Sequence, residues 1–170
     1  MSMWIEYILS HFSFCMFVLA FIMICFHKII KSNLSFSEIV YRWIALFPLG
    51  FSGIYAFIMH AFYSDIAAQT IGWTNSPFQF EVAMANLGFG VIAILSFRAT
   101  YGFRLATVIG NTCWLWGDAA GHIYQMIINH NFSVGNAGSW FWMDLILPLL
   151  LIICIINLKQ PKSSVKKYYY

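Results

Sequence analysis

WFWMDLILPLLLIICIINL, residues 140–158, is an almost unbroken apolar run whose single charged side chain is Asp144. Its length matches the roughly 20 apolar residues that an α-helix needs to cross a hydrocarbon layer of about 30 Å. Four further runs of this kind precede it, at residues 4–26, 39–60, 81–97 and 105–128. The sequence therefore predicts an all-α integral membrane protein, in which a bundle of five transmembrane helices forms a single domain over residues 1–158.

The composition of the 170 residues agrees with a membrane environment. Hydrophobic residues make up 61% of the chain and charged residues only 9%, whereas soluble domains carry about 25% charged residues. The four cysteines all lie in apolar runs and form no C-x-x-C pair, which argues against a zinc site or a disulfide framework. We expect the lipid bilayer as the main partner of this chain, and no nucleic acid.

The nine basic residues predict the orientation of the bundle. All nine lie in or beside the first and third connections or in the C-terminal tail. Lysine and arginine are retained on the cytoplasmic side of a membrane. The N-terminus and the connections 61–80 and 129–139 contain none. The basic positions are Lys28, Lys31 and Arg42 around the first connection, Arg98 and Arg104 around the third, and Lys159, Lys162, Lys166 and Lys167 in the tail 159–170. We expect the N-terminus outside, the C-terminus in the cytoplasm, and the first run as a retained helix rather than a cleaved leader.

The connection 61–80 is too long for a simple turn. Its larger side chains recur with near-helical spacing, at Phe62, Ile66, Gln69 and Trp73. This pattern predicts a short helix that lies on the outer membrane surface between the second and third spans.

The run 105–128 carries most of the polar residues that fall inside the predicted bilayer. At about 100° per residue, five of them share one narrow face. These are Asn111, Asp118, His122, Gln125 and Asn129. A second stripe, of Gly110, Gly117 and Gly121, lies on an adjacent face and has the small-residue spacing of closely packed membrane helices.

Asp118 and His122 are one helical turn apart, about 6 Å along the axis. A carboxylate and an imidazole at this spacing can hold one cation or share one proton. Other ligands would have to come from neighbouring helices, and we expect Glu81, His60 and Asp144, which all fall in the outer half of the bundle. A divalent metal ion is the cofactor candidate. The alternative is structural, because carboxylates also stabilise helix N-termini and polar side chains bond across a bundle.

Three stretches resemble a family of small prokaryotic membrane proteins of unknown function. They are IGWTNSPFQFEVAMANLG (residues 71–88), WGDAAGHIYQ (116–125) and GNAG (135–138). The resemblance covers the second to fifth predicted spans. It implies a multi-pass protein of the prokaryotic cytoplasmic membrane and assigns no role to any residue.

Three functions remain open from the sequence. The first is the binding or movement of a cation, either a metal ion or a proton, by an oligomer that packs through Gly117 and Gly121 or through Asn86, Gly90 and Ala93. The second is a membrane-embedded metal or haem enzyme that uses His60 and His122. The third is an accessory subunit of a larger membrane complex.

Overall fold

The computed structural model describes residues 3–30 and 33–158, and every regular element in these ranges is helical. The predicted basic tail 159–170 lies outside the described residues. In chain order the elements are α1 (Met3–Ser10), α2 (Phe12–Ile29), α3 (Phe36–Ile44), the π-helix η1 (Ala45–Phe51), α4 (Ser52–Phe62), α5 (Ser64–Ile71), α6 (Phe78–Leu95), the 3-10 helix η2 (Ser96–Arg98), α7 (Tyr101–Ile128), α8 (Val134–Ala137) and α9 (Ser139–Asn157).

Four helical segments are long and apolar enough to cross a membrane. They are Phe12–Ile29, Phe36–Phe62, Phe78–Arg98 and Val134–Asn157. α7 is the longest helix, with 28 residues, but its polar stripe makes it less apolar than these four. The structure is therefore an all-helical bundle with four candidate membrane spans, while the fifth crossing and the orientation stay predictions.

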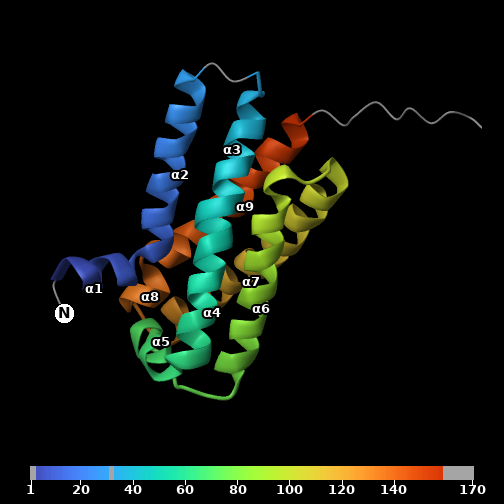
Figure 1. Cartoon of the computed structure of the whole chain (residues 1–170). Helices are drawn as coiled ribbons and strands as arrows, with labels where there is room; N and C mark the ends of the chain where they lie inside the picture. Colours follow the sequence, from blue (N-terminus) through green and yellow to red (C-terminus); the bar gives the residue numbers. More distant parts are fainter. Residues whose placement is uncertain (1–2, 31–32, 159–170) are drawn as a thin grey trace, which may run out of the picture.

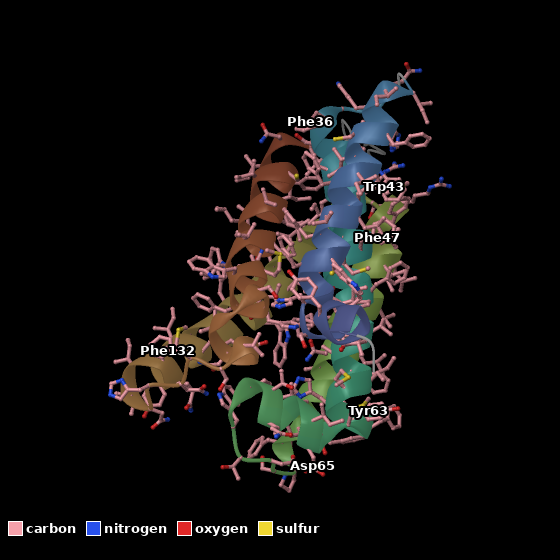
Figure 2. All side chains as sticks on the ribbon, turned by 90° about the vertical axis from the view of Figure 1, so that its left-hand side faces the viewer. Phe36, Trp43, Phe47, Tyr63, Asp65 and Phe132 are labelled. Carbon is pink, nitrogen blue, oxygen red and sulfur yellow. The ribbon has the colours of Figure 1, made fainter. Side chains whose placement is uncertain are left out.

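The long helices run side by side and define two ends of the bundle (Figure 1). α2, the continuous α3–η1–α4 segment and α6 lie next to one another, and α9 crosses behind α3 and η1. Figure 2 labels Phe36 at one end and Asp65 at the other. We call these the α3 end and the α5 end. The apolar core lies between α2, α3, η1 and α9, where Ile39, Tyr41 and Leu151 are almost fully buried.

α4 and α6 approach so closely that their backbones touch through glycine. A Cβ atom added to Gly53 would lie 2.8 Å from the Cα atom of Gly90. Ala93, one turn further along α6, is fully buried in the core. Asn86 donates to the carbonyl oxygen of Val82 in its own helix. The predicted self-association face of α6 is thus occupied inside the chain, which corrects that expectation.

The run 4–26, predicted as one helix, is two helices that meet at His11. α1 lies crosswise to α2 and projects from the side of the bundle (Figure 1). The break leaves carbonyl groups of α1 without their usual helical partners, and side chains from elsewhere replace these. Tyr55 Oη donates to the Leu9 oxygen at 2.9 Å, and Trp140 Nε1 donates to the Ser10 oxygen at 3.0 Å.

The helix predicted in the connection 61–80 is present as α5. Its N-terminal residue Ser64 follows α4 after a single residue, and it ends at Ile71, with Gly72 as its C-terminal cap. Gly72 adopts φ = +76°, a left-handed conformation that only glycine reaches without strain, and this turns the chain away from the helix axis. Ala67 and Ala68 bury one side of α5 against the bundle.

Candidate functional site

The two helices α7 and α9 bring a buried acid and a buried histidine together at the α5 end. His122 on α7 and Asp144 on α9 are 9% and 8% exposed. The Nε2 atom of His122 lies 3.9 Å from Oδ2 of Asp144. Asp118, one turn before His122 on the same helix, is half-buried. Two of the five predicted ligands, His122 and Asp144, thus approach one another, and we call this pair, with Asp118 one turn away on α7, the acid–histidine site.

The carboxylate of Asp144 is poorly compensated. In residues 3–30 and 33–158, no hydrogen-bond donor reaches it, and the His122 imidazole is its one ion-pair partner. At 3.9 Å this contact is longer than a hydrogen bond. The cost of burying Asp144 therefore depends on whether Asp144 or His122 carries a proton.

Asn136, a residue of α8, fixes the orientation of His122. Its side chain is 0% exposed and makes four hydrogen bonds. Oδ1 accepts from Nδ1 of His122 at 2.8 Å and from Nε1 of Trp73 at 3.2 Å. Nδ2 donates to the carbonyl oxygens of Asn131 at 2.9 Å and of His122 at 3.3 Å.

This network also determines the tautomer of His122. An indole nitrogen can only donate and a carbonyl oxygen can only accept, so the Asn136 amide cannot be turned around. Its Oδ1 atom must therefore receive a proton from Nδ1 of His122. In the neutral imidazole, the lone pair then lies on Nε2, the atom that faces Asp144. The imidazole therefore presents an acceptor nitrogen to the carboxyl group of Asp144, 3.9 Å away.

Two contacts bind the loop that carries Asn136 to α5. Asn131 donates to the carbonyl oxygens of Ile71 at 2.9 Å and of Gly72 at 3.3 Å. A Cβ atom on Gly135 would lie 2.9 Å from the Thr70 oxygen, so α8 packs directly on the backbone of α5. The position of His122 consequently depends on α5, α7, α8 and α9 together.

The other predicted metal ligands lie apart from this cluster. His60 on α4 hydrogen-bonds to Gln79 on α6 and lines a different pocket of about 390 Å³. Glu81 is exposed at the start of α6. Among the residues that the structure describes, no three His, Cys, Asp or Glu side chains gather in a way that could hold a metal ion. The five predicted ligands thus do not all lie in one place, and the binding of a metal ion by any of them stays a prediction.

The remaining polar residues of α7 have local partners. Asn111 is buried and donates to the Thr107 oxygen of its own helix at 3.0 Å. Asn129 donates to Gln125 at 2.6 Å, and both line a second pocket next to Trp73. The stripe is therefore one face of the helix, as predicted, but only its middle part belongs to the acid–histidine site.

The glycine stripe on α7 is used only in part within the chain. Gly110 faces the ring of Phe89, which would lie 3.1 Å from an added Cβ atom. At Gly117 and Gly121 an added Cβ atom would meet nothing within 4 Å. Packing of these two glycines against a second copy or another subunit stays a prediction.

A second charged cluster at the α3 end was not anticipated from the sequence. Arg104 is 6% exposed and binds Glu38 through two nitrogens, at 2.5 and 2.9 Å. Arg42 donates to the same carboxylate at 2.6 Å. The Nε atom of Arg104 donates to the Ser96 oxygen at 3.1 Å. Only the spacing of Glu38 and Arg42, four residues apart on one helix, could have signalled part of this cluster.

The chain belongs to a family of unknown function, DUF6790, whose model matches residues 10–164. This confirms the resemblance to a family without an assigned activity. No curated protein and no solved structure is a significant match to the chain. The function must therefore be argued from the acid–histidine site itself.

Proposed function

We propose that this protein binds and releases a proton at the Asp144–His122 pair, with Asp118 beside it, and thereby moves protons across a membrane. The observation that carries the proposal is the 3.9 Å approach of a free imidazole nitrogen to an acid that is only 8% exposed. Ionisable residues inside a membrane bundle are costly to bury, and they mark proton relays and ion pathways.

The geometry favours a proton over a metal ion. A metal site needs three or more ligands within about 2.0–2.6 Å of the ion. A proton needs only a donor and an acceptor that can approach one another. Asp144 and His122 supply these two groups, and the bond from Nδ1 of His122 to Asn136 at 2.8 Å presents the correct nitrogen.

The membrane arrangement belongs to the same proposal. α7 would be the fifth span, and the α5 end would face the outside of a prokaryotic cytoplasmic membrane, as the distribution of lysine and arginine predicts. The acid–histidine site would then lie in the outer half of the bundle. Its counterpart at the α3 end, the cluster around Glu38, has its charges paired and is suited to a structural role.

The proposal is tested by proton flux into proteoliposomes that contain a trapped pH-sensitive dye, with a potassium diffusion potential as the driving force. We expect Asp144→Asn to lower the flux at least tenfold, because an amide cannot release a proton. Glu81→Gln is the matched control, since Glu81 is an exposed acid at the same end of the bundle. Equal flux from Asp144→Asn and the wild-type protein, both monodisperse and helical, would refute the proposal.

A further inference from the structure

A polar pocket opens at the α5 end directly beside the acid–histidine site. Its volume is about 440 Å³, which is room for several water molecules at roughly 30 Å³ each. In the part of the chain that the structure describes, no charged side chain lines it. The lining residues are Gly72, Trp73, Thr74, Gln125, Asn129 and Asn131. Amide and hydroxyl groups of this kind both donate hydrogen bonds to water and accept them from it.

Trp73 belongs to both the pocket and the site. Its ring centroid lies 5.6 Å from that of His122, at a tilt of 41°. Its Nε1 atom donates to Oδ1 of Asn136, the same oxygen that binds His122. The residue is nevertheless 38% exposed and lines the pocket. The indole therefore stands between the pocket and the buried imidazole.

One hydrogen bond, to Asn136, and a ring contact with His122 hold the indole of Trp73 in this position. Trp73 follows the left-handed Gly72 and belongs to a non-helical stretch before α6. Its backbone N–H donates to the Ala68 oxygen at 2.9 Å, which holds the main chain in place. Rotation of the side chain away from His122 would break the hydrogen bond of the indole to Asn136.

We propose that Trp73 is the gate through which water in this pocket reaches the His122–Asp144 pair. With the indole against His122, the pair is closed to the pocket; with the indole turned away, a chain of water connects the two. The proposal rests on the proposed proton function, because it supplies the route by which the proton enters or leaves. Trp73 is then a positioning residue that acts on His122 in two ways. It orients the imidazole through Asn136, and it controls the access of water to the imidazole.

The test is acylation of His122 by diethyl pyrocarbonate in the purified full chain, followed by peptide mass spectrometry. The reagent attacks the unprotonated imidazole nitrogen, so it reports directly on access to Nε2. The exposed His130 is the internal reference for reagent activity. His60, which is held by Gln79, is the internal control for folding.

We expect Trp73→Ala to raise the rate at His122, relative to His130, at least tenfold while the rate at His60 stays unchanged. Trp73→Phe keeps a ring over His122 and should raise the rate less than threefold. Trp116→Ala is the matched control, because Trp116 is an exposed indole on the same helix as His122 and donates only to the Leu145 oxygen at 3.5 Å. This variant should leave the rate at His122 unchanged.

Equal rates at His122 in Trp73→Ala and Trp116→Ala would overturn the gate, as would wild-type acylation of His122 as fast as that of His130. Acylation does not depend on proton movement, so the two proposals fail separately. A selective rise in Trp73→Ala together with normal flux in Asp144→Asn would keep the gate and remove the proton function.

Discussion

The clearest quantitative prediction concerns Asn136, whose amide joins α5, α7 and α8. Asn136→Ala removes four hydrogen bonds at once and leaves the donors of Trp73 and His122 unpaired in a buried space. A hydrogen bond inside a protein contributes about 1 kcal/mol net, and one between membrane helices averages about 0.6 kcal/mol. For four bonds, the substitution should therefore cost roughly 2–4 kcal/mol of the free energy of unfolding.

Asn111→Ala is the matched control for this experiment. Asn111 is also a buried asparagine, but its side chain makes one hydrogen bond, to its own helix. Its removal should cost about 1 kcal/mol or less. The measurement is unfolding in mixed micelles of increasing dodecyl sulfate, followed by tryptophan fluorescence and by helix content. If the two variants lost the same stability, Asn136 would not be the organising residue of the site, and the argument for the tautomer of His122 would fall with it.

Two further predictions use paired variants in the same unfolding assay. Gly53→Leu should lower the free energy of unfolding by about 1–3 kcal/mol or more, because the added side chain meets the backbone of α6. Gly117→Leu should change it by no more than about 1 kcal/mol, since its Cβ faces open space. Equal losses in the two variants would contradict the packing of α4 on α6. Arg104→Lys should lower the free energy of unfolding by about 2 kcal/mol, because lysine cannot keep both bonds to Glu38. Arg42→Lys loses one partly exposed contact and should lower it by under about 1 kcal/mol. A reversed order would show that Arg104 is not the main partner of Glu38.

Most of the helices could be predicted from hydropathy, because burial in lipid requires long apolar runs with satisfied backbones. The break at His11 could not, since no proline or glycine marks it. It depends on Tyr55 and Trp140, which donate to carbonyl groups 46 and 130 residues away. A contact of this kind exists only after the helices have packed.

The candidate site, too, has residues that the sequence predicts and residues that it does not. Helical periodicity alone predicts that Asp118 and His122 share a face of α7, and a charged residue in an apolar run draws attention to Asp144. Trp73 was predicted only as part of a short surface helix, and Asn136 was part of a motif without a role. Both act through contacts between separate elements, 63 residues apart in the case of their own hydrogen bond.

Two acids of this chain, Glu38 and Asp144, differ in a way that separates structure from function. Glu38 accepts hydrogen bonds from two arginines, so its charge is compensated and its burial needs no further explanation. Asp144 is no more exposed to solvent, yet the one ion-pair partner that the described residues offer it is an imidazole nitrogen at 3.9 Å. A charge at such a position costs roughly 2.5–3.5 kcal/mol on insertion scales, and an apolar residue of similar size would avoid that cost. Since the surrounding network holds His122 with its free nitrogen toward this acid, the arrangement is better explained by the exchange of a proton than by the stability of the fold.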